Sequence, residues 1–208
     1  KTTKDSTTSE FELIKCDTLV TEATFGLPIF KHPNPNIEIK KVLESLETYN
    51  DTNHLIGVYA LGKAQRIIKL LRENGFQDTI FIHGALKKIC DYYQLNGINL
   101  GKLETITKDS SNYKQKIILA PPSALNDRWS RKFRNKILSQ ASGWMNIKQR
   151  VKQSLIEIPL VISDHSDWNE LTDTIINTNA ENVWITHGRE DGLMYWCKTK
   201  GINSKPLS

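Results

Sequence analysis

Short apolar runs alternate with amphipathic stretches along most of this 208-residue chain, and no other feature restricts its fold as much. One cycle consists of a predicted strand at His54–Ala60, a helix at Gly62–Asn74 that Gly75 ends, and a second strand at Thr79–His83. Strands that are joined through helices by short connections pair in parallel, because each helix carries the chain back across the sheet. The sequence therefore predicts an α/β protein with a mostly parallel sheet, arranged as one large domain or two small ones.

The same patterns predict further elements on both sides of this cycle. We expect strands at Asp17–Thr21, Lys116–Ala120, Leu155–Ile162 and Asn182–Thr186. We expect helices at Ile37–Tyr49, Ala85–Gln94, from Ser123 through Arg128–Phe133, Asp167–Asn177 and Glu190–Lys200. The stretch from Leu95 to Tyr113 has the weakest pattern, so we expect it to be rich in loops.

Positive charge is concentrated in one part of the chain. The net charge is +5, and no Asp or Glu occurs between Arg128 and Ile156. The basic residues of this stretch are Arg128, Arg131, Lys132, Arg134, Lys136, Lys148, Arg150 and Lys152. Trp129, Phe133 and Trp144 are interleaved with them. Basic side chains neutralise phosphates and aromatic rings stack on unpaired bases, so the stretch indicates contact with nucleic acid. The alternative is a solvated helix face with its aromatic side chains in the core.

The chain carries no sequence signal for a membrane or for secretion. No apolar run is long enough to span a bilayer, and residues 1–10 are too polar for a secretory signal. Cys16, Cys90 and Cys197 lie far apart and form no Cys-x-x-Cys pair, which is typical of a reducing compartment. We therefore expect a cytoplasmic protein with no membrane partner.

Polar residues follow three of the predicted strands, at the carboxyl ends where layered α/β proteins gather ligand and catalytic groups. Glu22 ends the first strand, Asp164 and His165 follow the strand that ends at Ile162, and His187 ends the last. A histidine beside carboxylates could act as a general acid or bind a metal ion. His187 could bind zinc or manganese, or could simply donate to a loop carbonyl. Glu22 could equally be a solvated surface residue.

Two other local patterns have a physical explanation. Asp167, with Glu170 three residues later, is close to the capping-box pattern at the start of a helix. Gly62 and Lys63 join a predicted strand to a helix, so backbone N–H groups there, with Lys63 and Arg66, could bind a phosphate. The spaced first glycine and the Ser/Thr of a Walker A loop are missing, and a cationic solvated face is the alternative.

Taken together, these segments resemble the β-CASP branch of the metallo-β-lactamase nucleases. Thr-Glu-Ala-Thr-Phe-Gly at 21–26 is similar to the acidic motif A of that branch, Ser-Asp-His-Ser-Asp-Trp at 163–168 to motif B, and Thr-His-Gly at 186–188 to motif C. Three further segments, at 60–66, 120–125 and 142–145, are similar to the bacterial ligase-associated DNA exonucleases, which are often labelled mRNA 3′-end processing factors.

The resemblance implies a partial metallo-β-lactamase αββα sandwich with an inserted α/β β-CASP domain of mostly parallel sheet. Residues 1–36 and 156–208 would belong to the sandwich, and residues 37–155 to the β-CASP domain. The implied activity is metal-dependent hydrolysis of phosphodiesters in DNA, or in RNA, with exonuclease action in ligase-associated DNA repair.

The resemblance also implies roles for individual residues. His187 would bind one of two divalent metal ions, zinc or manganese, and His165 would act as general acid toward the leaving oxygen. Glu22 would orient His165, and Asp164 would belong to the same catalytic motif. The residues that would bind nucleic acid are Lys63, Arg66, Arg128, Arg131, Lys132, Arg134 and Trp144.

This sequence departs from the family in its metal site. The family's His-x-His-x-Asp-His loop, a later His and a bridging Asp are all missing, and no two of the five histidines are spaced as His-x-His. We therefore expect a C-terminal portion that binds metal weakly, has no nuclease activity alone, and exposes apolar surface that a missing N-terminal half would cover.

The expected partners are nucleic acid, that N-terminal half and an ATP-dependent DNA ligase. The main alternative is a non-catalytic nucleic-acid-binding module. The long basic insert argues against a hydrolase of small substrates.

Overall fold

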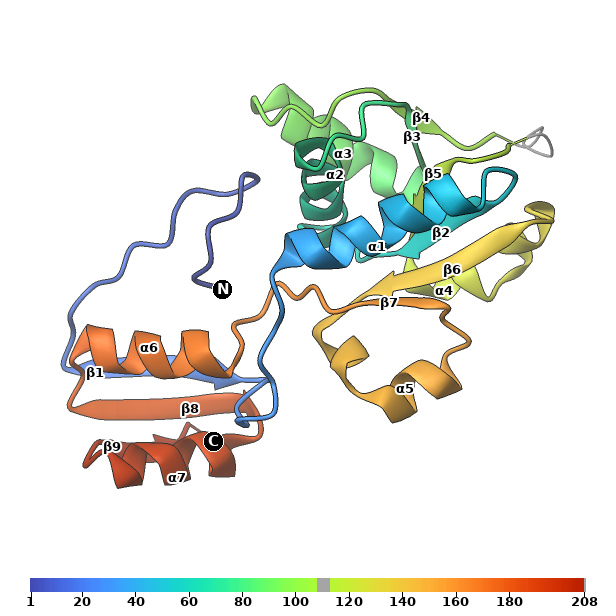
Figure 1. Cartoon of the computed structure of the whole chain (residues 1–208). Coiled ribbons are helices and arrows are strands. Elements are labelled where there is room, and N and C mark those ends of the chain that lie inside the picture. Colours follow the sequence, from blue (N-terminus) through green and yellow to red (C-terminus); the bar gives the residue numbers. More distant parts are fainter. Residues whose placement is uncertain (108–112, 208) are drawn as a thin grey trace. The chain divides into compact units, whose positions relative to one another are not determined.

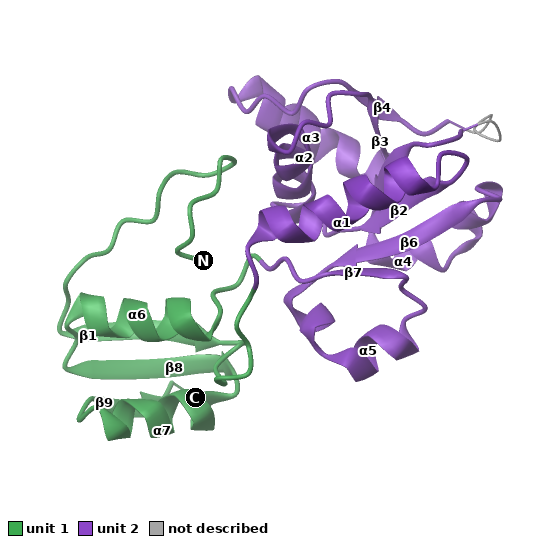
Figure 2. Cartoon of the chain, viewed as in Figure 1, with its two compact units in different colours: residues 1–32, 164–208 green, residues 33–163 purple. Residues whose placement is uncertain are grey.

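The computed structural model of the chain describes residues 1–107 and 113–207, which form two compact units (Figures 1 and 2). Unit 1 combines the two ends of the chain, residues 1–32 and 164–208, and unit 2 is the continuous segment 33–163. The sequence-based boundaries lie nearby, after residues 36 and 155. None of the described helices is long and apolar enough to cross a membrane.

Unit 2 is built on a six-stranded sheet in which every described strand pair is parallel. Its strands, in spatial order, are β4 (Leu103–Thr105), β3 (Ile80–Ile82), β5 (Ile117–Ala120), β2 (Asn53–Gly57), β6 (Lys136–Ala141) and β7 (Ile158–Leu160). The strand β2 is buried along its whole length, because sheet neighbours flank it on both sides and helices cover both faces.

Helices cover the two faces of this sheet unequally. The first face carries α1 (Pro35–Thr48), α2 (Lys63–Glu73) and α3 (Gly84–Leu95), which bury Ile56, Ile82 and Leu119 in the larger core cluster. The second face carries α4 (Pro122–Leu125) and the 3₁₀ helix η2 (Arg128–Lys132), which pack over Leu55 and Ile118. Two short helices, η3 (Gly143–Asn146) and α5 (Lys148–Gln153), connect β6 to β7. Alternate residues of each strand therefore face different cores, as the pleat of a strand requires.

Unit 1 has a smaller sheet, in which β1 (Thr18–Ala23), β8 (Asn182–Gly188) and β9 (Asn203–Pro206) are parallel and β8 lies in the middle. The helices α6 (Trp168–Thr178) and α7 (Glu190–Thr199) share a core with Val183 and Ile185 of β8. The rings of Trp168 in α6 and Trp196 in α7 meet edge to face at 6.2 Å, so the two helices are neighbours on one face.

The opposite face of the unit 1 sheet has no helix against it among the described residues of that unit. On this face Val20 is 52% exposed, and it is paired in register with Trp184. The ammonium of Lys205 lies 4.3 Å from the centre of the Trp184 ring and shields part of it. Val20 and Trp184 therefore leave some apolar area accessible on this face.

The prediction of an α/β protein with a mostly parallel sheet is confirmed. Three of the described strands, β4, β6 and β9, were not predicted. The segment predicted as one helix from Ser123 through Phe133 forms two short pieces, α4 and η2. The strand β7 lies in the unit 2 sheet because its backbone pairs with β6, whereas the sequence-based boundary after residue 155 assigned it to the final segment. Residues 108–112 of the stretch expected to be rich in loops lie outside the described residues.

Candidate functional site

Glu22 lies at the carboxyl end of β1, where its backbone pairs with Thr186 of β8. One carboxylate oxygen, Oε2, accepts a hydrogen bond of 2.6 Å from the backbone N–H of Thr24, two residues later. The side chain is 31% exposed, so it is partly shielded from water but reachable. The turn after β1 therefore fixes the carboxylate at the edge of the sheet.

A β-bulge at this edge displaces His187 from the regular pleat. Glu22 pairs with Thr186, but Ala23 pairs with Gly188, so His187 is the extra residue on β8. Its φ of 51° lies in the left-handed region, which costs energy for a residue with a Cβ. Bulges of this kind redirect a side chain, and they are frequent beside active sites.

Gly188 makes the bulge possible. Its φ is +134°, and a Cβ added there would lie 2.2 Å from the carbonyl oxygen of Ala23. The same carbonyl accepts hydrogen bonds of 3.0 Å from the N–H groups of Gly26 and Arg189. Only glycine fits this close approach, which explains why glycine follows His187 in the sequence.

His165 lies on the loop that leads into α6, and a capping box fixes the end of this loop. The Asp167 carboxylate accepts from the N–H of Glu170 at 2.9 Å, and Glu170 accepts from the N–H of Asp167 at 3.0 Å. The other oxygen of Asp167 accepts from the N–H of His32 at 2.8 Å. The capping box predicted from the sequence is confirmed.

The two loops bring Glu22, Thr24 and His165 together. The Nδ1 atom of His165 lies 3.5 Å from Oε1 of Glu22 and 3.4 Å from Oγ1 of Thr24. The Phe25 ring packs edge to face against the imidazole, with 6.2 Å between the ring centres. The His165 side chain is 57% exposed, and Asp164, its neighbour in the sequence, is exposed as well. A carboxylate beside Nδ1 can orient an imidazole.

The residues present do not by themselves fit a pair of metal ions. Within residues 1–107 and 113–207, no group of three or more His, Cys, Asp or Glu side chains is placed to hold a metal ion. His187 is exposed, and its Nδ1 lies 3.1 Å from the Thr186 hydroxyl. One imidazole cannot retain a catalytic zinc ion, which needs three protein ligands or more.

The basic stretch lies in unit 2, and three of its arginines, Arg128, Arg131 and Arg134, are exposed on and just after η2. Lys132 is placed differently, because its ammonium lies 4.9 Å from the Trp129 ring centre and 5.4 Å from that of Phe133. Burial lowers the pKa of Lys132. The three arginines are therefore the accessible cations of this segment, while Lys132 packs on its aromatic residues.

Trp144 forms a second pairing of a cation with an aromatic ring. The Arg150 guanidinium, from α5, lies 4.4 Å from the ring centre of Trp144 in η3. Trp144 is partly exposed, and Lys148, Arg150 and Lys152 are exposed. An accessible ring beside such cations can stack on an unpaired base.

Lys63 and Arg66, by contrast, are 4% and 5% exposed. The Lys63 ammonium donates to the carbonyl of Ile162 at 3.1 Å, and the Arg66 guanidinium donates to the carbonyl of Ser163. These cations bind the chain's own backbone in unit 2. Little of either cation is accessible here, and the phosphate contacts expected of Lys63 and Arg66 remain a prediction.

Sequence reasoning missed two contributors to the His165 loop. The sequence predicted no role of its own for Thr24. In the structure its N–H donates to Glu22, and its hydroxyl oxygen lies beside Nδ1 of His165. Residues 1–3 all contact Glu170, which caps α6. The only local signal for Thr24 was its place two residues after Glu22, and no local pattern links residues 1–3 to position 170.

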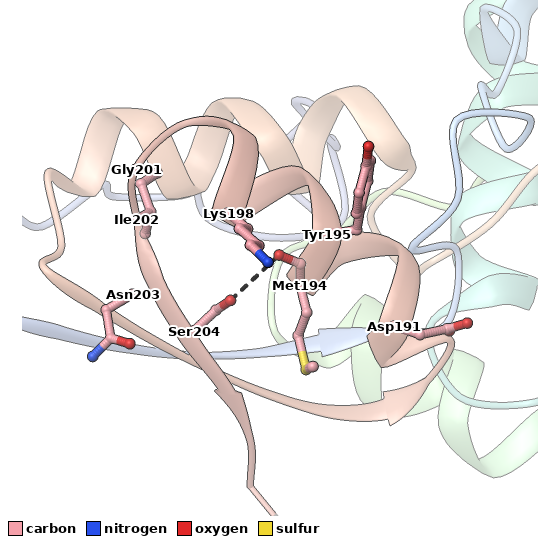
Figure 3. Close-up of a pocket in the computed structure, with 8 residues that line it drawn as sticks. All are labelled: Asp191, Met194, Tyr195, Lys198, Gly201, Ile202, Asn203 and Ser204. Carbon is pink, nitrogen blue, oxygen red and sulfur yellow. Dashed lines mark hydrogen bonds between the residues drawn. The ribbon is translucent and has the colours of Figure 1, made fainter.

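A separate hollow lies between α7 and β9 (Figure 3). Figure 3 shows Met194 and Lys198 on the helix, opposite Ile202 and Ser204, whose hydroxyl donates to the Met194 carbonyl at 3.5 Å. None of the predicted site residues lines this hollow. The candidate site is therefore the Glu22–Thr24–His165 cluster with the adjacent His187 bulge.

Comparison with known proteins finds distant similarities. No protein-family model matches the chain. The sequence is 22% identical over 209 aligned residues to a protein of Opitutus terrae named "Probable DNA ligase", covering 90% of this chain but only 20% of that relative. The fold is similar to that of a protein of unknown function from Enterococcus faecalis V583, with a TM-score of 0.57 and 9% identity, over 94% of this chain and 50% of that one. The structural likeness concerns the fold alone.

Proposed function

We propose that this chain is the substrate-positioning and proton-donating part of a metal-dependent phosphodiesterase that acts on DNA. The observation that carries this proposal is the Glu22–His165 pair at a strand end where a β-bulge also presents His187. The relative named as a probable DNA ligase supports DNA as the substrate and a ligase as a partner. The exposed arginines of unit 2 supply a surface for the phosphate backbone.

In this proposal, His165 acts as an imidazolium with a hydrogen on each ring nitrogen. Its Nε2 gives a proton to the oxygen that leaves phosphorus as water attacks and the phosphodiester bond breaks, and the Nδ1–H tautomer remains. Glu22 and Thr24 both lie beside Nδ1, on the other side of the ring, where they orient it. The distances of 3.4 and 3.5 Å are long, and catalytic hydrogen bonds often shorten only when substrate binds. We further propose that polypeptide outside this chain supplies the metal ligands, which is consistent with the lack of a metal cage among the described residues.

We also propose that unit 1 is one layer pair of a metallo-β-lactamase sandwich and that unit 2 is the inserted β-CASP domain. The uncovered face of the unit 1 sheet supports this, since a second sheet packed there would bury Val20 and Trp184. Under this proposal, residues 163–168 correspond to motif B of the family and residues 186–188 to motif C.

The catalytic half of the proposal makes a direct prediction. Joined to a segment that supplies the His-x-His-x-Asp-His ligands, the chain should cleave end-labelled DNA in a reaction that EDTA stops. His165→Gln should then lower kcat by about 10²- to 10⁴-fold, which is the usual contribution of a general acid. Asn169→Ala, an exposed substitution in the first turn of α6, is the matched control. EDTA-sensitive cleavage by the isolated chain, or full activity of His165→Gln, would contradict the assignment.

The nucleic-acid surface can be tested separately. Arg128, Arg131 and Arg134 replaced together by Gln should weaken binding of a single-stranded oligonucleotide by at least about tenfold at low salt. The slope of log K against log salt should become shallower by about 2, because each lost phosphate contact removes roughly 0.7. Fluorescence anisotropy at several salt concentrations measures both quantities.

A triple variant with the same loss of charge elsewhere in unit 2, Lys40→Gln, Lys69→Gln and Lys88→Gln, is the control. Its affinity should stay within about threefold of the parent chain, because these lysines lie on α1, α2 and α3. Equal weakening by the two triple variants would show that net charge, not this surface, determines binding.

The absence of a metal cluster in the described residues favours one other function, a non-catalytic nucleic-acid-binding module. Such a module would bind single strands in a salt-dependent way but would not depend on His165 or His187. The DNA upstream of the coding sequence separates the two functions. An in-frame segment encoding His-x-His-x-Asp-His supports the phosphodiesterase, and a start codon at this position supports the module.

A further inference from the structure

Thr24 makes polar contacts with both members of the Glu22–His165 pair. Its backbone N–H donates to Oε2 of Glu22 at 2.6 Å, and its hydroxyl oxygen lies 3.4 Å from Nδ1 of His165. The other oxygen of Glu22 lies 3.5 Å from the same nitrogen. A carboxylate and a hydroxyl therefore flank one ring nitrogen at almost equal distances.

The position of Thr24 is set by the backbone around it. The turn after β1 closes through the hydrogen bond of 3.0 Å from the N–H of Gly26 to the carbonyl of Ala23. The N–H of Arg189 donates to the same carbonyl, and a Cβ on Gly188 would lie 2.7 Å from the nitrogen of Thr24. The hydroxyl is thus attached to a closely packed segment, which can hold it beside the His165 ring.

We propose that Thr24 is a positioning residue that, together with Glu22, holds the Nδ1–H tautomer of His165 and so directs Nε2 outward. An ionised carboxylate can only accept a hydrogen bond, so Glu22 favours the tautomer that carries its hydrogen on Nδ1. The Thr24 hydroxyl can accept from the same N–H, and the two acceptors share one donor. The catalytic meaning of this arrangement rests on the proposed function, but the tautomer and the orientation of the ring do not.

The chemistry distinguishes Thr24 from an ordinary packing residue. Valine has the same shape as threonine and fills the same space, but it cannot accept a hydrogen bond. Serine lacks only the methyl group and keeps the hydroxyl. A packing role would therefore be preserved by Thr24→Val and weakened by Thr24→Ser, whereas the role proposed here has the opposite pattern.

The experiment is ¹⁵N NMR of the imidazole nitrogens in the full chain, at a pH of about 8.5, where imidazoles are ordinarily neutral. Thr24→Val should reduce the ratio of the Nδ1–H to the Nε2–H tautomer of His165 by about fivefold, the equivalent of one lost neutral hydrogen bond. Thr24→Ser should restore the ratio, and Glu22→Gln should also reduce it. The signals of His54 and His83, which lie in unit 2, should not change in any variant.

Two outcomes would overturn the proposal: an unchanged His165 ratio in Thr24→Val, or a Thr24→Ser ratio that matches the valine variant. If Thr24→Val does not fold, as a changed signal of His32, a unit 1 histidine whose ring packs on Phe25, would reveal, Thr24→Ala and Thr24→Ser give the same comparison. The NMR result is independent of cleavage, so a protein that never cleaves DNA would refute the proposed function and leave the positioning role standing.

Discussion

Glu170→Gln is expected to lower the free energy of unfolding of this chain by about 3 kcal/mol at neutral pH. The Glu170 carboxylate is 12% exposed, and Oε2 accepts from the Lys1 ammonium at 2.9 Å and from the N–H of Asp167 at 3.0 Å. Oε1 accepts from the N–H groups of Thr2 and Thr3 at 3.2 and 2.7 Å and from both of their hydroxyls. A glutamine presents only one acceptor oxygen and no negative charge to these donors.

The pH dependence of this stability follows from the pKa of Glu170. Burial alone would raise it, but the hydrogen bonds from Lys1 and Thr3, the charge of Lys1 and the N–H of Asp167 outweigh burial, and the pKa falls from 4.5 to about 2. Because the pKa is lower in the folded chain than in the unfolded chain, the stabilisation is complete above about pH 4.5 and is lost as the pH falls toward about 2. A fall of this size corresponds to about 3 kcal/mol.

Urea unfolding of both chains between pH 7 and pH 2 measures this contribution. The difference between the parent chain and Glu170→Gln should be constant down to about pH 4.5 and should then shrink as the pH approaches 2. The control is Glu47→Gln, which removes an exposed carboxylate from α1 and should change stability by less than about 0.5 kcal/mol. A difference that stays the same at every pH would show that the carboxylate charge is not its source.

The second large effect is expected for Arg72→Met, which should lower the free energy of unfolding by about 3 kcal/mol. The guanidinium of Arg72, near the end of α2, donates to four backbone carbonyls: Leu100 at 3.1 Å, Phe76 at 2.9 Å, Asp78 at 2.6 Å and Lys102 at 2.9 Å. These carbonyls belong to the loops that enter β3 and β4, so one side chain joins both loops to the helix. Methionine keeps the apolar stem and removes every donor.

Arg72→Lys should recover less than half of this loss, because an ammonium lacks the planar arrangement of donors that reaches four carbonyls at once. The exposed substitution Lys88→Met in α3 is the control. Hydrogen exchange adds a local measurement: the amides of Ile80 and Leu103 should lose protection before those of β2. A stability of Arg72→Met within about 1 kcal/mol of the parent chain would contradict this prediction.

Much of the fold could be predicted because local patterns determine it. The strand that ends at Gly57 is a short apolar run, and the helix after Gly62 has apolar residues at helical spacing. Asp167 with Glu170 is a local signal for a helix start. The strand β6 was missed because its sequence, Lys-Ile-Leu-Ser-Gln-Ala, lies within the basic run and only its pairing with β2 and β7 identifies it. The strand β9 has mostly polar residues and forms because β8 offers an edge.

The site was predictable only in part, because its geometry depends on strand pairing and packing as well as on local sequence patterns. Glu22 and His165, remote in sequence, do meet, and that meeting depends on the order of the strands rather than on either local pattern. The bulge at His187 and the role of Thr24 are three-dimensional features with no clear local signal. For Lys63 and Arg66 the sequence suggested a cationic helix start, but it carried no signal that the two side chains are buried and donate to the carbonyls of Ile162 and Ser163.

The discontinuous character of unit 1 has a consequence for the order of folding. The strand β1 precedes unit 2 in the chain, but its sheet neighbour among the described residues, β8, follows the whole of unit 2. Unit 2 is continuous, so it can collapse during synthesis, whereas the ends that form unit 1 must wait for each other. During that interval Leu19 and Val20 lack their partners on β8, Val183 and Trp184. We therefore expect slow refolding phases to report on unit 1 and fast phases on unit 2, and chaperones to bind nascent chains that stop before Asn182.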